Sequence, residues 1–307
     1  MTTVSAVRPA RRRRLGSSGP RRVVGQRWWT PYLFMLPGLF FFATMFAWPA
    51  VLAVQLAFAR YSVASPPEFV GLANFATLLE DPRFHIALRN SFVFLIMFLP
   101  LCVVAPLFMA ILVNQKLRGI QVFRVAYYLP VITSMVAVAI AWRFVMSRDG
   151  VINWLLSLIG VGPIGFLLDS HWALPSVVII EAWKSLGLYM MLYLAGLQSV
   201  QPELLEAAKM DGASWLRRLW HVIVPAILPF VAVTLTLAML DAMRSFESIY
   251  MLTRGGPQDS TLTLGYYIWH VAFERYDMGY ASAVGLVLWA IMIILALLNQ
   301  LVTRKQD

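Results

Sequence analysis

The sequence predicts an all-α membrane protein with six transmembrane helices. Hydrophobic residues make up 60% of its 307 residues and charged residues 13%, about half of the charged fraction that is usual in soluble domains. Long charge-free intervals recur along the chain, and a helix needs about 20 apolar residues to cross a hydrocarbon core of about 30 Å. Most of the protein surface is therefore expected to face lipid.

Two other classes of protein are excluded by composition. Cys102 is the single cysteine, so a disulfide-stabilised secreted scaffold cannot form. Aromatic residues make up 13% of the chain, which is incompatible with intrinsic disorder over its length.

The charge-free intervals divide a transmembrane domain, 28–307, into six expected spans. The first apolar run is far longer than the roughly 7–15 residues of a signal peptide core, so we expect it to be retained. The uncharged interval 150–168 is broken by glycines and a proline, and its apolar part is too short to cross, so we expect a loop helix outside the membrane. The expected spans are about 31–58, 90–114, 125–146, 174–198, 222–246 and 280–302.

The distribution of basic residues predicts the orientation of these spans. Most of the 25 lysines and arginines lie in the N-terminal stretch, the second and fourth connections and the C-terminal tail. Connections rich in Lys and Arg stay in the cytoplasm, so both termini are predicted to be cytoplasmic in a plasma (inner) membrane protein. Residues 1–27 are expected to form a mobile basic arm. The net charge of +10 thus reflects topology beside membrane lipid, with no nucleic-acid partner expected.

Motifs for catalysis are missing from the sequence. None of its four lysines follows the glycine-rich pattern of a phosphate-binding loop, and its four histidines have no metal-ligand spacing. We therefore expect a non-enzymatic chain with no catalytic residue, no metal site and no cofactor of its own.

The connection at 199–221 has the pattern of two short helices and a turn. Pro202 suits a first helical position and Glu203 suits the first turn. Asp211-Gly212 is predicted to end the first helix, and Ser214 to cap the second. By these signals alone the segment could be a simple cytoplasmic hairpin.

Three sequence segments give the chain a specific resemblance. Residues 206–225 match an E-A-A-x3-G loop that ends in proline, residues 69–75 match F-x-G-L-x-N-F, and residues 249–257 match I-Y-x-L-T-x-G-G-P. This combination resembles the permeases of binding-protein-dependent ABC importers, in the carbohydrate-uptake branch of maltose- and glycerol-phosphate-type permeases. The resemblance implies the MetI-like ABC importer permease fold, with cytoplasmic coupling helices.

The resemblance also implies a set of partners. The loop would couple the chain to a separate ATPase subunit, which would bind the ATP and Mg. Two ATPase subunits, a second and different permease, and an extracytoplasmic binding protein on loops 60–88 and 247–280 would complete the importer. The coupling residues implied are Glu206, Ala207, Ala208, Asp211, Gly212 and Pro225.

Charged residues within the expected spans are candidates for a substrate pathway, because charge at membrane depth must be paired or face water. Glu181 and Lys184 share one helix face, as do Asp241 and Arg244, so each pair could neutralise itself. Structural pairing between helices or to a partner subunit is the alternative. The aromatic residues expected to stack on sugars along this pathway are Trp183, Tyr189 and Phe246.

The function predicted is import of a carbohydrate or polyol, including a sugar or glycerol phosphate ester, driven by a separate ATPase. One alternative is an ion-coupled secondary carrier in which Glu181 and Asp241 bind the ion. A second alternative is a membrane scaffold or receptor. The sequence does not identify the substrate.

Overall fold

A computed structural model describes residues 29–62, 65–115 and 119–304 of the chain. The expected basic arm, 1–27, lies outside these described residues. The chain divides into two compact units, Met1–Val51 and Leu52–Asp307, and each is described by itself.

The described part of the first unit is one long apolar helix. It consists of α1 (Thr30–Phe42), the π-helical segment η1 (Ala43–Ala47) and the beginning of α2 (Trp48–Ala57). With the rest of α2, these segments make a candidate span, Thr30–Ala57, of 28 residues, close to the expected 31–58. Within the first unit, the Thr44 hydroxyl donates to the Phe40 carbonyl at 2.8 Å, so its polar atom is satisfied inside the helix.

The second unit begins with a small polar cap before its first long helix. Strands β1 (Ala59–Ser62) and β2 (Ser65–Phe69) pair antiparallel and are followed by α3 (Ala73–Glu80). Helix α4 (Pro82–Val113) is capped at its start by Asp81, whose carboxylate accepts a hydrogen bond from the Arg83 amide at 2.9 Å. This hairpin departs from the all-α expectation within the described residues, which are otherwise helical or irregular.

The remaining helices follow α4 in chain order. They are α5 (Ile120–Ile132), α6 (Met135–Val145), α7 (Val151–Ser157), α8 (Ala173–Ser199), α9 (Pro202–Met210), α10 (Trp215–Arg218), η2 (Leu219–Ile223), α11 (Val224–Ala226), α12 (Leu228–Met243), α13 (Glu247–Leu252), α14 (Leu264–Trp269), η3 (His270–Glu274) and α15 (Met278–Arg304).

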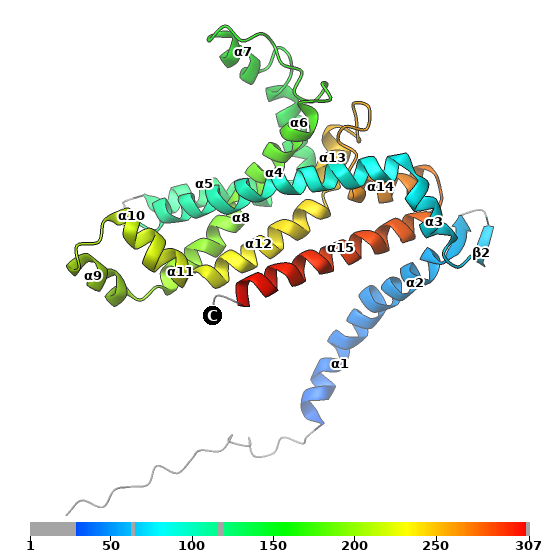
Figure 1. Cartoon of the computed structure of the whole chain (residues 1–307), viewed down its shortest axis with the longest axis horizontal. Helices are drawn as coiled ribbons and strands as arrows, with labels where there is room; N and C mark the ends of the chain where they lie inside the picture. Colours follow the sequence, from blue (N-terminus) through cyan, green and yellow to red (C-terminus); the bar gives the residue numbers. More distant parts are fainter. Residues whose placement is uncertain (1–28, 63–64, 116–118, 305–307) are drawn as a thin grey trace, which may run out of the picture. The chain divides into compact units, whose positions relative to one another are not determined.

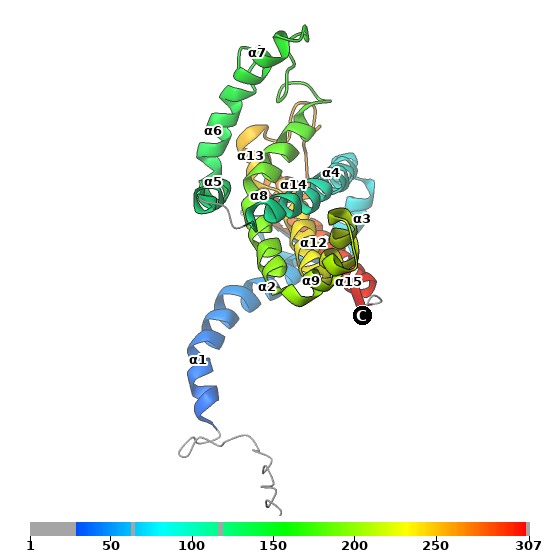
Figure 2. The same ribbon diagram turned by 90° about the vertical axis from the view of Figure 1, so that its left-hand side faces the viewer.

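Four unbroken helices are long and apolar enough to cross a membrane, and the count reaches six if each of two bent pairs is one span. The expected third and fifth spans, 125–146 and 222–246, are therefore not single straight helices. Helices α5 and α6 meet at 101°, and the segments Trp215–Ala226 and Leu228–Met243 meet at 71°. Short α7 lies beyond the end of α6 (Figures 1 and 2), as expected for a loop helix.

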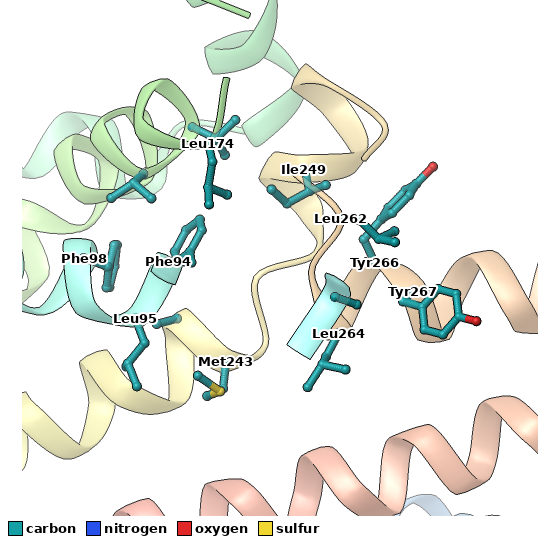
Figure 3. Packing of buried hydrophobic residues seen from close by; sticks show 14 of the residues in the cluster. Phe94, Leu95, Phe98, Leu174, Met243, Ile249, Leu262, Leu264, Tyr266 and Tyr267 are labelled. Carbon is teal, nitrogen blue, oxygen red and sulfur yellow. The ribbon is translucent and has the colours of Figure 1, made fainter. Parts of the chain in front are cut away.

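The core of the second unit forms where α4 packs between α8 and α12, with α15 against α12 (Figure 1). Phe94 and Phe98 on α4 are fully buried there, beside Leu174 of α8 and Met243 of α12 (Figure 3). In lipid, helices gain little from hiding apolar surface and associate through close packing instead. The core therefore fixes the relative positions of α8, which carries Glu181 and Lys184, and α12, which carries Asp241.

Candidate functional site

Helix α9 and its turn have the local geometry that the sequence predicts. Pro202 is at the first helical position, and the helix ends where Gly212 adopts a left-handed φ of 72°. The Ala213 amide donates to the Ala208 carbonyl and the Gly212 amide to the Lys209 carbonyl, both at 3.0 Å. This pair of bonds is the Schellman motif, which closes a helix end with a left-handed residue.

The second helix of this connection begins at the predicted cap. The Ser214 hydroxyl accepts a hydrogen bond from the Arg217 amide at 3.4 Å, and α10 runs on through η2 and α11. Pro225 lies in α11, two residues before the bend at Ile227 and apart from α9. It is therefore at the base of the connection rather than on its tip.

The α9 surface is open to solvent in the isolated chain. Glu206, Ala207, Asp211 and Gly212 are exposed, and Ala208 is half-buried. Met210 is 88% exposed. No residue of α9 is buried, and α9 lies at one end of the second unit (Figure 1). Small and apolar side chains exposed together are typical of a surface that another protein covers.

A polar cavity of about 400 Å³ lies near the opposite ends of α8 and α12. Helix α8, the end of α12, the start of α13 and the first residue of α6 all contribute side chains to it. The lining residues are Met135, Glu181, Lys184, Ser185, Asp241, Arg244, Ser245, Phe246, Glu247 and Ser248.

One of the two predicted charge pairs forms in this cavity. Arg244 Nη2 lies 2.9 Å from Asp241 Oδ1, in the expected pairing along one helix face. The second oxygen of Asp241 accepts a hydrogen bond from the Tyr189 hydroxyl at 2.8 Å. Asp241 is thus held by its own helix and by α8.

Glu181 and Lys184 do not form the direct pair that their spacing suggests. The Glu181 carboxylate accepts hydrogen bonds from Ser248 and from Ser245, the latter at 3.2 Å. The Lys184 ammonium instead donates to the Val131 carbonyl of α5 at 3.4 Å. The two serines were not predicted as site residues, because nothing local in the sequence places the segment after α12 beside α8.

The three predicted aromatic residues lie in different environments. Phe246 lines the cavity. Trp183 is 38% exposed and packs edge-on against Trp142, with ring centroids 5.4 Å apart, but it does not line the cavity. Tyr189 is fully buried, so it cannot offer a ring face to a sugar; it orients Asp241 instead.

Phe246 also belongs to an aromatic cluster that we did not predict. Its ring lies 5.5 Å from Tyr250, 6.4 Å from Tyr266 and 5.9 Å from Trp269, measured between centroids. Tyr250 and Trp269 approach to 4.7 Å. Tyr250 comes from α13, and Tyr266 and Trp269 come from α14, so only the fold brings the α14 rings beside Phe246.

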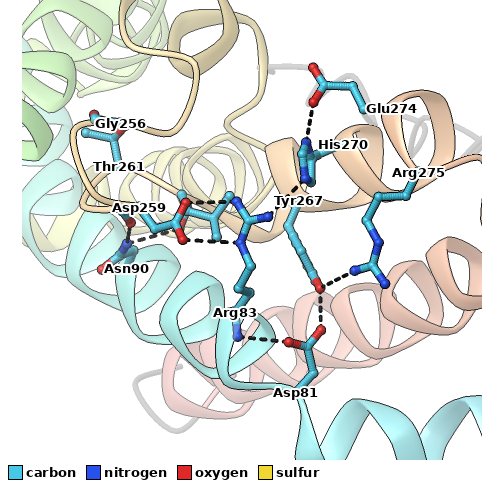
Figure 4. Close-up of polar contacts among 11 residues, drawn as sticks. Asp81, Arg83, Asn90, Gly256, Asp259, Thr261, Tyr267, His270, Glu274 and Arg275 are labelled. Atoms are coloured by element: carbon cyan, nitrogen blue, oxygen red, sulfur yellow. Dashed lines mark hydrogen bonds and ion pairs between the residues drawn. The ribbon is translucent and has the colours of Figure 1, made fainter.

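A second polar network fastens the loop that contains the G-G-P segment (Figure 4). Arg83 of α4 donates through Nε and Nη2 to the two carboxylate oxygens of Asp259, at 3.2 and 2.9 Å. The Asn90 amide donates to the Asp259 and Leu262 carbonyls. His270 contacts Arg83 at 3.0 Å and Glu274 at 2.6 Å. Asp259 and Leu262, which follow the G-G-P segment, therefore join the α13–α14 loop to α4.

Asp81 closes this network at the start of α4. Its carboxylate accepts hydrogen bonds from the hydroxyls of Tyr267 and Tyr280 and from the Arg83 amide. Burial raises the pKa of this carboxyl, but the hydrogen bonds together outweigh burial and hold the pKa below its ordinary value of 3.8. Burial and the bond to Asp81 raise the pKa of Tyr267 to about 12, so its hydroxyl stays protonated as the donor.

Metal ligands do not cluster in the described ranges 29–62, 65–115 and 119–304, where no group of three His, Cys, Asp or Glu side chains could hold an ion. The side chains around the polar cavity can instead bind a ligand through hydrogen bonds and charge. A polar cavity at one end of a helix pair and an exposed small-residue helix at the other are features of a multi-pass membrane transport subunit.

The comparisons with known proteins agree with that class. Residues 87–307 match the family described as binding-protein-dependent transport system inner membrane component. The chain belongs to this family, and the resemblance noted from its motifs is confirmed. It is accordingly a multi-pass subunit of the inner membrane.

Relatives match over most of the chain. It is 34% identical to the probable ABC transporter permease protein YurN of Bacillus subtilis, over 90% of this chain and 97% of that protein. It is 33% identical to the lactose transport system permease protein LacF of Rhizobium radiobacter, over 78% and 82%. A solved bacterial alginate ABC transporter, in complex with an alginate pentasaccharide-bound periplasmic protein, has a similar chain with a TM-score of 0.77 and 25% identity, over 90% and 94%.

Proposed function

We propose that this chain is a permease subunit of an ATP-driven carbohydrate importer, driven by a separate ATPase that binds α9 and the turn after it. The observation that carries the proposal is the exposure of α9, which lies in the connection that joins α8 to α12 along the chain. This position leaves Glu206, Ala207 and Gly212 exposed among the residues of the second unit that the structure describes. A small-residue helix can seat closely in a groove of a partner, while Glu206 supplies polar contacts.

The two ends of the α8–α12 pair suggest how ATP binding by the partner would change the shape of the substrate cavity. Helix α8 runs from Glu181 and Lys184 in the cavity to α9, and α12 returns from the α10–α11 segment to Asp241 and Arg244. A displacement of α9 would therefore tilt both cavity-lining helices together. Rigid-body motion of this kind would open the cavity to one side of the membrane at a time.

A carbohydrate is the substrate class that we infer. Relatives are named for transport of lactose and of alginate. The cavity offers carboxylates, hydroxyls and the Phe246 ring, a mixture suited to a polyhydroxylated ligand with an apolar ring face. A sugar phosphate or glycerol phosphate ester remains within the proposal because Lys184 and Arg244 also line the cavity. An ion-coupled carrier finds no support among relatives that are ABC permeases.

The proposed importer contains a second permease, two ATPase subunits and an extracytoplasmic binding protein. ATP and Mg would bind to the ATPase subunits alone. A binding protein is part of the solved complex of the similar alginate transporter. In this chain, loops 60–88 and 247–280 are the proposed docking region. Both termini and α9 are placed in the cytoplasm under this proposal.

The test uses the complete importer, co-expressed with its partners and reconstituted in liposomes. Glu206→Ala and Gly212→Asp are expected to abolish substrate-stimulated ATP hydrolysis while leaving the subunits partly assembled. Glu206→Ala removes a polar group of the docking surface, and Gly212→Asp adds a charged side chain to the left-handed turn beside it. Ser157→Ala, on α7 and far from α9 in sequence, is the control and should retain stimulation. Normal stimulated hydrolysis and transport by both α9 variants would refute the coupling role.

A further inference from the structure

The break between α5 and α6 lies directly beside the polar cavity. Helix α5 ends at Ile132, α6 begins at Met135, and Met135 lines the cavity. The two arms of this broken span meet at 101°. A change in the angle between them would therefore change the shape of the cavity wall.

The two arms pack mainly against different helices. Helix α5 packs against α8, whereas α6 packs against α13. Arg143 near the end of α6 donates to the Leu252 carbonyl of α13 at 3.0 Å. The broken span thus connects α8 and α13 through a sharp bend, which is the arrangement of a hinge. The two sides of the hinge also touch directly, because Ser248 of α13 donates to Glu181 of α8 and Trp142 of α6 packs against Trp183 of α8.

At Gly187, α8 approaches the backbone of α5 closely. A Cβ atom built on Gly187 would overlap the Tyr127 carbonyl oxygen and would lie 3.0 Å from the Tyr127 carbonyl carbon and the Tyr128 Cα. These are backbone atoms of α5, so no side-chain rotation could relieve the overlap. Glycine at such a crossing lets two membrane helices approach to backbone contact.

Lys184 lies one turn away on α8 and holds the end of α5. Its ammonium donates to the Val131 carbonyl in the last turn of that helix. Carbonyls in a last turn lack helical partners, and a cation is favoured there by the helix dipole. In the part of the chain that the structure describes, no carboxylate forms an ion pair with Lys184. Among the described residues, its side-chain hydrogen bond is therefore the one to α5.

We propose that Gly187 and Lys184 are positioning residues that make α5 move with α8, so that motion of α8 turns the α5–α6 hinge and reshapes the cavity. The inference rests on the proposed function, in which the partner at α9 moves α8. Lys184 then acts through the backbone of α5. This assignment gives Lys184 a structural role between helices, one of the two alternatives that the sequence analysis left open, rather than a direct contact with the substrate.

Spin labels can measure the angle at the hinge in the complete reconstituted importer. Val122 on α5 and Phe144 on α6 are 70% and 72% exposed, so cysteines there would be accessible on the two arms. Cys102, the single native cysteine, is replaced by alanine. In the otherwise unchanged chain, we expect the distance between labels to shift when ATP with vanadate traps the closed ATPase.

Variants of the two positioning residues should change this response. Lys184→Met and Gly187→Ala are expected to broaden the distance distribution without nucleotide and to reduce the ATP-induced shift to less than half. Lys184→Arg keeps a cationic donor and should behave as the unchanged chain does. Gly285→Ala is the matched control, because a Cβ on that glycine of α15 would meet nothing within 4 Å.

Three results would overturn the inference. One is a distance between labels that does not respond to nucleotide in the labelled chain that keeps Lys184 and Gly187. That measurement does not depend on whether the Lys184 and Gly187 variants fold. Another is an unaltered distribution in both Lys184→Met and Gly187→Ala. The third is a rise in transport KM in Lys184→Met with an unchanged distribution, which would make Lys184 a substrate contact. In all three cases the proposed function would stand, provided that transport still requires the ATPase.

Discussion

At the residue scale, Asp81 illustrates how a single carboxylate stabilises the second polar network, the one around Arg83 and Asp259. One of its oxygens accepts from the Arg83 amide, and the other from the hydroxyls of Tyr267 and Tyr280. These donors come from α4, α14 and α15, so the carboxylate joins three elements that are far apart in sequence. Each bond favours the ionised form, which explains the direction of its pKa shift.

The lowered pKa of Asp81 predicts a pH dependence of stability. Because its folded pKa lies below the ordinary 3.8, Asp81 contributes to the free energy of unfolding above about pH 4. That contribution is lost as the pH falls through the folded pKa. Asp81→Asn should therefore lower the unfolding temperature at pH 7, and its difference from the unchanged protein should shrink below pH 4.

Thermal unfolding of the purified chain in detergent, measured between pH 3 and pH 7, checks this expectation. Asp149→Asn is the control, since Asp149 is exposed and should alter the unfolding temperature little at any pH. A difference between Asp81→Asn and the unchanged protein that stayed constant over this range would contradict the role of the charge.

At the element scale, the turn after α9 depends on backbone conformation rather than on packing. A Cβ on Gly212 would meet nothing within 4 Å, but its φ of 72° lies in the left-handed region. Gly212→Ala should therefore destabilise the end of α9 by about 1 kcal/mol. Hydrogen exchange at the amides of residues 211–213 should become roughly fivefold faster.

The matched control for this prediction is Gly285→Ala in α15. Its Cβ would also meet nothing within 4 Å, and Gly285 is helical, so alanine there should stabilise the helix by about 1 kcal/mol. Opposite signs for two glycines in equally open space would isolate the effect of φ. Equal effects at both positions would show that the left-handed conformation does not limit this turn.

The signals in the sequence were sufficient to predict the structure of the α9 connection but not the breaks in the third and fifth spans. Pro202, Gly212 and Ser214 act through their own backbones, so each role follows from local chemistry. The break of the third span depends on two features acting together. Pro130 removes a backbone donor, and Ser134 then caps a new helix by accepting from the Val136 amide at 3.3 Å.

Helix α4 provides the contrast, because Pro100 and Pro106 lie inside it and it continues unbroken to Val113. No capping side chain follows either proline directly, so the chain has no alternative to the helix. The hydrogen bonds of Glu181 were unpredictable for another reason. Its partners Ser245 and Ser248 are more than sixty residues away, and only tertiary packing brings them to α8.

At the scale of the whole molecule, the second unit separates two tasks along one pair of helices. Polar and charged side chains gather at one end of α8 and α12, and exposed small residues gather at the other. The apolar outer faces between these ends suit lipid. Such a division predicts that the two ends lie on opposite sides of the membrane.

Cysteine labelling from each side of the membrane tests this sidedness. Met210 near the tip of the α9 connection is 88% exposed, and Phe273 in the α14–α15 region is 57% exposed. A membrane-impermeant maleimide should label Phe273→Cys in intact cells and Met210→Cys only after permeabilisation. The unchanged chain is the control, since its one cysteine, Cys102, is fully buried and should not react. Labelling of Met210→Cys in intact cells would place α9 outside the cell, where no ATPase could bind it. That result would exclude the proposed coupling to an ATPase through this helix.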